Sequence, residues 1–250
     1  MGPFEKNMEE ARINSITELF FWAASEFMEE GLFNEAAEKI VTLIKAFEFE
    51  TYLYESLTKR MDVLTYKDFE KFISELIKRI EISKKAAEYF NKPEQLEALT
   101  HFSSLLSNHL KKKAGVYDEG KKPEKAIKYL NEAFVLESGD KEIIDLRQSL
   151  IEKYLNVHID GIQHKIEWVK GQVSLFIVAA CEIIVRLGDK IVFKEKVDAH
   201  QLFQGTISTS FPSGKSDNKP SVSKKEGGIS FEVYRGLNKG RLTIKLDKLK

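Results

Sequence analysis

At 250 residues the chain has room for one large domain or two of ordinary size. Lysine plus arginine equals aspartate plus glutamate, at 39 residues each, so no net field favours nucleic acid or an anionic membrane surface. The single cysteine, Cys181, excludes an internal disulfide framework and fits a reducing compartment.

The N-terminal ten residues contain no basic segment followed by an apolar one, so we expect no signal peptide. The longest apolar run, residues 175–185, is interrupted by Glu182 and is shorter than the ~20 residues that a membrane span needs. The sequence therefore predicts a cytoplasmic protein without membrane insertion.

From residue 8 to about residue 155 the pattern is helical, because glycine is scarce while glutamate, lysine, alanine and leucine dominate. The first helix pair is predicted between Ile16 and Glu48, with its turn at Gly31. Apolar residues at helical spacing line both of its helices: Phe20, Ala24 and Phe27 before the turn, and Ala36, Ile40 and Leu43 after it. Residues 51–82 are predicted to follow as one or two longer amphipathic helices.

The segment from Ser107 to Asp140 carries the clearest helix-pair pattern, with a Gly-Lys-Lys-Pro break at residues 120–123. Its small, aromatic and turn residues are Ala114, Tyr117, Gly120, Ala126, Leu130 and Ala133. This arrangement resembles the tetratricopeptide repeat (TPR), a helix–turn–helix unit of about 34 residues. It departs from the repeat where Leu110 stands at the usual tryptophan position and Ser138 at the usual proline position.

The first helix pair has a similar order of alanine, aromatic residue and glycine, and a weaker version runs through Ala86, Tyr89, Pro93, Ala98 and Phe102. The first and last units begin about 90 residues apart, which is not a whole number of repeats. We therefore predict a degenerate TPR-like stack of roughly seven or eight helices. The resemblance implies a concave face that receives a peptide or a protein surface.

Beyond residue 156 the apolar period shortens to two residues, which indicates strands. Alternating strands are predicted at residues 191–196, 229–233 and 242–246, the last two joined as a hairpin. Residues 173–185 are apolar on both faces, as in a central strand.

The predicted fold class is α+β with two domains. Residues 1–155 are expected to form an all-α, TPR-like stack of helix hairpins. Residues 156–250 are expected to form an antiparallel β-sandwich of immunoglobulin-like architecture, with a mobile loop at residues 213–228.

Residues that could bind a metal or phosphate do not form complete motifs. His158, Asp160 and His164 lack the further ligands that complete a metal site. The tripeptide Gly214-Lys215-Ser216 lacks the preceding glycine and the following helix of a phosphate-binding loop. We therefore expect no metal and no cofactor.

A nucleophile for catalysis is also missing from the pattern. Asp198 and His200 would share one face of a strand, but a base needs a nucleophile beside it. Cys181 lies inside an apolar run, as an inert core thiol does. We expect no catalytic residues, so the chain is predicted not to be an enzyme.

The candidate partner-binding residues are basic, amide and aromatic side chains of the helical region. Asn108, Lys112 and Lys128 belong to the last helix pair and are of the types with which some TPR proteins hold an acidic peptide. Trp22 follows Phe20 and Phe21, and one helix face cannot bury all three residues, so one of them is available to a partner.

The leading hypothesis is a non-catalytic adaptor or scaffold that binds a protein or a peptide through the concave helical face, and an acidic peptide is one such partner. The strand region would act as a second interaction or capping module. One alternative is a structural subunit of a homo-oligomer or larger assembly. Another is a small-ligand-binding protein or enzyme, with its site at the domain junction near His158, His164 and Trp168 or in the strand region near His200.

Overall fold

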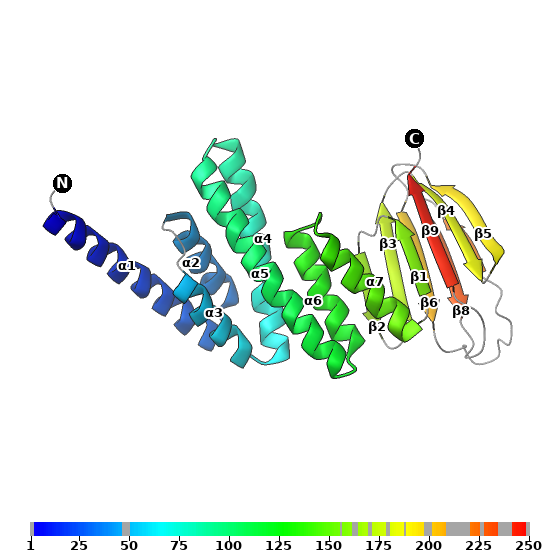
Figure 1. The fold of residues 1–250 in the computed structure, drawn as a ribbon, viewed down its shortest axis with the longest axis horizontal. Coiled ribbons are helices and arrows are strands. Elements are labelled where there is room, and N and C mark those ends of the chain that lie inside the picture. The colour runs from blue at the N-terminus through cyan, green and yellow to red at the C-terminus, as the bar shows by residue number, and fades with distance from the viewer. Residues whose placement is uncertain are drawn as a thin grey trace. The chain divides into compact units, whose positions relative to one another are not determined.

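A computed structural model describes residues 3–46, 51–155, 157–161, 165–169, 172–178, 181–187, 189–197, 202–208, 221–225, 228–234 and 242–248. Figure 1 shows helices up to residue 155 and strands after it. The helices are α1 (Pro3–Glu29), α2 (Phe33–Ala46), α3 (Thr51–Val63), α4 (Tyr66–Tyr89), α5 (Pro93–Glu119), α6 (Pro123–Leu136) and α7 (Lys141–Leu155). The prediction of an all-helical, helical-repeat-like N-terminal region is confirmed.

Three of the helix pairs are joined by the same backbone turn. After α1, the N–H of Leu32 donates to the carbonyl oxygen of Phe27 at 2.8 Å, and the N–H of Gly31 donates to that of Met28 at 3.2 Å. The same pair of hydrogen bonds follows α4 and α5, with Asn91 and Lys121 in the place of Gly31. This is the Schellman motif, which satisfies the last carbonyl groups of a helix by placing one residue in the left-handed region.

The left-handed residue differs among the three turns, with φ of 75° at Gly31, 50° at Asn91 and 54° at Lys121. A lysine in this region strains its backbone by about 1–2 kcal/mol, while glycine loses about 0.5–1 kcal/mol more chain entropy on folding. We therefore expect Lys121→Gly to raise the free energy of unfolding by about 0.5–1 kcal/mol, measured by urea denaturation.

The matched control is Gly31→Ala, which places a side chain in the same left-handed conformation. Nothing lies within 4 Å of a Cβ added at Gly31, so any loss of stability comes from the backbone alone. We expect a loss of about 1 kcal/mol. Equal stabilities for the Lys121→Gly variant and the native chain would contradict the left-handed turn.

Helix starts follow local signals in the sequence. Pro93 and Pro123 are the first residues of α5 and α6, where a missing N–H costs nothing. Thr65 caps α4, because its Oγ1 accepts from the backbone N–H of Asp68 at 3.3 Å and donates to the Asp68 carboxylate at 2.7 Å. At α7, the Asp140 carboxylate accepts from the N–H of Glu142 at 2.8 Å.

Most residues of the predicted apolar faces are buried in the first and last helix pairs, whereas Phe20, Phe27 and Tyr117 are only half-buried. Side chains with no more than 3% exposed surface include Ala24, Ala36, Ile40, Leu43, Ala114, Ala126, Leu130 and Ala133. In the weaker version of the pattern, Ala86 is exposed and Tyr89 is 84% exposed, whereas Phe102 is buried. Tyr89 instead stands edge-on to Phe90, at 5.0 Å between ring centroids, beside the turn.

Nine strands are described after α7, in two mixed sheets. One has the order β1-β9-β4-β5 and the other the order β2-β3-β6-β8-β7. Their bounds are β1 (Val157–Gly161), β2 (Lys165–Val169), β3 (Gln172–Val178), β4 (Cys181–Leu187), β5 (Lys190–Val197), β6 (Leu202–Ser208), β7 (Ser221–Lys225), β8 (Gly228–Tyr234) and β9 (Leu242–Lys248).

The predicted fold class, which ended in an antiparallel immunoglobulin-like β-sandwich, is wrong. Strand β1 pairs in parallel with β9, and β6 pairs in parallel with β8. Helices α1–α7 supply most of the residues whose side chains the structure describes. The error arose because alternation identifies a strand but says nothing of the direction or identity of its neighbour.

Three details of the strand prediction also change. The strands at residues 229–233 and 242–246 form no hairpin with each other, since β8 and β9 belong to different sheets. The apolar run at residues 173–185 divides into β3 and β4, again in different sheets. Part of the loop predicted at 213–228 forms β7, antiparallel to β8, while residues 213–220 lie outside the described residues.

Backbone contacts divide the chain into two compact units, residues 1–109 with 135–138, and residues 110–134 with 139–250. Within the second unit, the Nδ2 of Asn131 on α6 donates to the carbonyl oxygen of Ile166 on β2. The Tyr154 ring on α7 stands edge-on to Trp168, at 5.9 Å. This unit therefore has helices and strands in one core, and the boundary predicted at residues 155/156 stays a prediction.

Candidate partner-binding surface

Helix α5 buries one side and exposes the other. Leu106 and Leu110 are fully buried, and Ala114 is 3% exposed. Asn108 and Lys112 lie one turn apart on the opposite side, where both are exposed. Asn108 belongs to the first compact unit and Lys112 to the second, so the two residues are not assigned to one site.

Lys128 lies on the other helix of the same hairpin and is also exposed. The buried sides of α5 and α6 face each other, as the stacked rings of Tyr117 and Tyr129 show, with centroids 5.2 Å apart. Lys112 and Lys128 each lie opposite the buried side of their own helix. They therefore point away from each other, and the three polar residues do not form one cluster.

Lys111, the sequence neighbour of Lys112, forms ion pairs inside the second unit. Its Nζ lies 3.0 Å from Asp140 Oδ2 and also pairs with Glu142 Oε2, and its side chain is only 12% exposed. Burial alone would lower the pKa of Lys111, but hydrogen bonds to Glu142 and Asp140 and their charges raise it. Burial alone would raise the pKa of Asp140. The hydrogen bond and charge of Lys111 and the backbone N–H groups outweigh burial, so the pKa of Asp140 is lowered.

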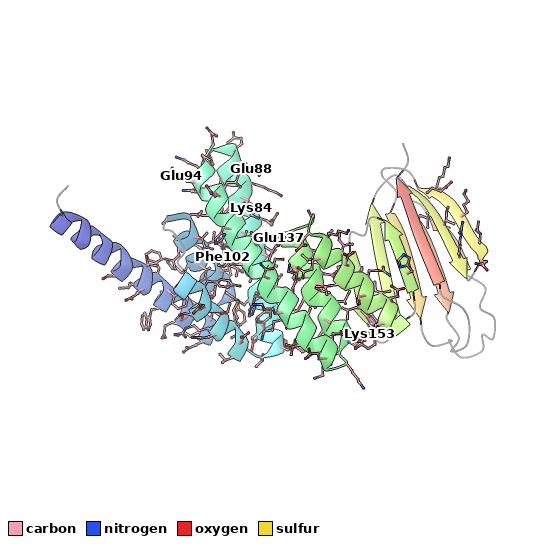
Figure 2. The ribbon with its side chains drawn as sticks, in the orientation of Figure 1. Lys84, Glu88, Glu94, Phe102, Glu137 and Lys153 are labelled. Atoms are coloured by element: carbon pink, nitrogen blue, oxygen red, sulfur yellow. The ribbon has the colours of Figure 1, made fainter. Side chains whose placement is uncertain are left out.

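A second pair of contacts joins α5 to α7. The Nζ of Lys153 lies 2.8 Å from both carboxylate oxygens of Asp118, and the Tyr154 hydroxyl donates to Asp118 Oδ1 at 2.9 Å. Figure 2 labels Lys153 on α7. The hydrogen bond to Asp118 raises the pKa of Lys153, and burial together with Asp118 raises the pKa of Tyr154. Lys111 and Lys153 are thus neutralised by internal carboxylates.

Lys112 differs from both, because it makes no ion pair within the part of the chain that the structure describes. One turn further along α5 lies Gly115, where nothing is found within 4 Å of an added Cβ, and Val116 is 63% exposed. Within the second unit, the outward face of α5 therefore combines a cation with bare backbone. Gly115 was not among the predicted binding residues. Its position inside a helix pattern, away from any turn, was the signal in the sequence that marks a functional or packing role.

Trp22 is 61% exposed on α1, next to Leu19 at 68%. Of the three neighbouring aromatic residues, Phe20 and Phe21 are half-buried, with Lys39 Nζ 5.4 Å from the Phe20 ring centre and the Arg60 guanidinium 6.0 Å from that of Phe21. Trp22 belongs to the first compact unit and Lys112 to the second, so they are not assigned to one site.

The residues proposed for a junction site have structural partners where they are described. His158 Nδ1 lies 3.2 Å from Gln148 Nε2 and 3.8 Å from Glu152 Oε2, and Trp168 is only 7% exposed. His164, Asp198, His200 and the tripeptide at residues 214–216 lie outside the described residues. The side chains of Asp160 and Cys181 lie outside them as well.

Among the described residues, no group of three or more histidine, cysteine, aspartate or glutamate side chains is placed to hold a metal ion. None of the helices in that part of the chain is long and apolar enough to cross a membrane. Comparison with protein-family models, curated proteins and solved structures gives no significant match.

Proposed function

We propose that this chain is a non-catalytic, cytoplasmic adaptor that binds a protein partner through the outward face of α5. The observation that carries the proposal is the contrast between Lys112 and its neighbours. Lys111 and Lys153 are paired with internal carboxylates, whereas Lys112 is exposed and makes no described ion pair. A carboxylate of a partner protein can therefore pair with the Lys112 ammonium, with which no described carboxylate of the chain pairs.

The surroundings of Lys112 suit an acidic, extended segment. Gly115 leaves the helix surface open one turn after Lys112, so a peptide backbone can approach closely. The helical-repeat-like N-terminal region supports the same role, because stacks of helix pairs typically present helix faces to peptides.

The test is affinity capture from native lysate by the full chain, followed by binding measurements on each protein recovered. Lys112→Glu is expected to weaken binding at least about tenfold, because it replaces a favourable charge contact by a repulsive one. The affinity is also expected to fall as salt is added, as for any exposed charge contact.

The matched control is Lys128→Glu, the same change at an exposed lysine on the opposite side of the hairpin. It is expected to change the affinity less than about twofold. Equal losses in both variants would contradict a site on the α5 face. Recovery of nothing but the chain itself would contradict the adaptor and favour self-assembly, for which Leu19 and Trp22 of α1 offer exposed apolar surface.

A further inference from the structure

The last turns of helix α4 carry a second apolar stripe, opposite the side that packs into the core. Tyr89 and Phe90 are 84% and 66% exposed, and their rings stand edge-on with centroids 5.0 Å apart. Ala86 and Ile82 precede Tyr89 by about one and two turns on the same side of the helix, and both are exposed. We call Ile82, Ala86, Tyr89 and Phe90 the α4 stripe. The buried residues of α4 lie on the other side: Phe69, Phe72, Ile73, Leu76, Ile77, Ile80 and Ala87.

The turn after α4 does not itself require aromatic residues. All three Schellman turns expose the two residues that precede the left-handed residue. These two residues are Glu29-Glu30 after α1 and Glu119-Gly120 after α5, so the same backbone turn forms with polar or small side chains. Only after α4 are they an aromatic pair. Because exposing two large rings to water gives the folded chain no stability, a contact with another molecule is the better explanation.

The described part of the chain leaves the α4 stripe uncovered. From residue 81 to residue 94, around the turn between α4 and α5, Ala87 is the only buried residue. A single pair of helices cannot bury its apolar surface alone and needs a neighbouring helix to complete a core. The molecule that covers the α4 stripe is therefore expected to present a helix.

The charges beside the stripe indicate which helix this is. Four charged residues lie along one flank of the α4 stripe, at intervals of three, four and three residues: Lys78, Glu81, Lys85 and Glu88. Their signs alternate, and reading the four residues in the opposite direction reverses every sign. A second α4 that runs antiparallel therefore places each lysine opposite a glutamate. Glu81, Lys85 and Glu88 are available for these contacts, because they make no ion pair among the described residues.

We propose that the α4 stripe is the interface of a homodimer, in which the α4 helices of two copies pack antiparallel with Ile82 beside the two-fold axis. In this register Lys85 of each copy lies opposite Glu81 of the other. The four aromatic rings of two stripes can bury on the order of 600 Å². The isoleucines, alanines and lysine stems raise the buried surface to about 1,000 Å², the lower limit for a specific interface.

An interface of this size predicts a weak dimer, with a dissociation constant on the order of 10 μM. The dimer goes beyond the proposed adaptor function and does not depend on the α5 surface. A monomer that captures a partner would refute the dimer alone, and a dimer that captures no partner would refute the adaptor alone.

The test is analytical ultracentrifugation of the full chain from about 1 to about 200 μM, a range that spans the expected dissociation constant. The mean mass of the native chain is expected to rise from 28.7 kDa toward twice that value. Tyr89→Glu combined with Phe90→Glu gives this turn the residues of the turn after α1, so this variant is expected to keep its helical circular dichroism and to stay monomeric. The matched control is Trp22→Glu, an exposed aromatic residue of the same compact unit, which is expected to dimerise like the native chain.

A mixing experiment tests whether the occupant is a second, antiparallel copy. Lys85→Glu and Glu81→Lys each place like charges opposite one another in the dimer, so each is expected to weaken association at least about tenfold. An equimolar mixture of the two variants pairs opposite charges again and is expected to associate about as strongly as the native chain.

Four results would overturn the dimer. The first is a native chain that stays monomeric throughout the concentration range, which would leave the α4 stripe to a different protein. The second is association that the double substitution at Tyr89 and Phe90 does not weaken, and the third is loss of the dimer in Trp22→Glu. The fourth is a mixture of Lys85→Glu and Glu81→Lys that associates no more strongly than either variant alone.

Discussion

Replacing Trp168 by alanine is expected to lower the free energy of unfolding by about 3–5 kcal/mol. Trp168 is 7% exposed on β2, and the Tyr154 ring stands edge-on to it from α7. Removing the indole leaves a cavity where a helix and a strand of the second unit meet. Urea denaturation followed by circular dichroism at helical wavelengths measures the loss, and shows whether α7 unfolds with the strands.

The chain provides its own control, because it has only two tryptophans. Trp22 is 61% exposed, so Trp22→Ala is expected to change stability by less than about 0.5 kcal/mol. Trp22→Ala also leaves Trp168 as the only tryptophan of the chain, so tryptophan fluorescence then reports on the strand region alone. If Trp168→Ala were neutral, Trp168 could not be a core residue, and a role in ligand binding would become the better explanation.

Replacing Leu110 by alanine is expected to cost about 2–5 kcal/mol. Leu110 has no exposed surface and lies on the side of α5 that also buries Leu106 and Ala114. The predicted resemblance to the tetratricopeptide repeat places Leu110 at the usual tryptophan position, so the experiment measures how far a smaller residue performs the packing that this resemblance predicts. Denaturant unfolding of the full chain gives the value.

Val116 provides the comparison on the same helix. It is 63% exposed, and Val116→Ala is expected to stay within about 0.5 kcal/mol of the native chain. A similar loss of stability in Leu110→Ala and Val116→Ala would mean that the side of α5 carrying Val116 also packs against other residues. A negligible cost for Leu110→Ala would contradict the described orientation of α5.

The candidate site could be predicted only in part. The sequence predicts its residue type and its helix, since Lys112 belongs to the clearest helix-pair pattern of the chain. Which lysine faces outward could not be found, because Lys111 and Lys112 differ by only about 100° around the helix axis. Asp140 and Glu142 decide it, through ion pairs with Lys111 from a helix that begins some 30 residues later.

Local chemistry determined the helical part of this protein. The turns at Gly31, Asn91 and Lys121 and the helix starts at Pro93 and Pro123 depend on a few adjacent residues. The apolar period that marks the faces of α2 and α6 is likewise a property of single helices. Such features can be read along the chain because their energies depend on neighbours three to five residues away.

Tertiary structure alone decided how the strands pair and which polar groups are enclosed. Strand β9 pairs with both β1 and β4, and β8 lies between β6 and β7, although the sequence placed β8 and β9 in one hairpin. Arg147, a charged residue of α7, is fully buried. Pairing and burial depend on contacts between residues far apart in the chain, which alternation and composition cannot specify.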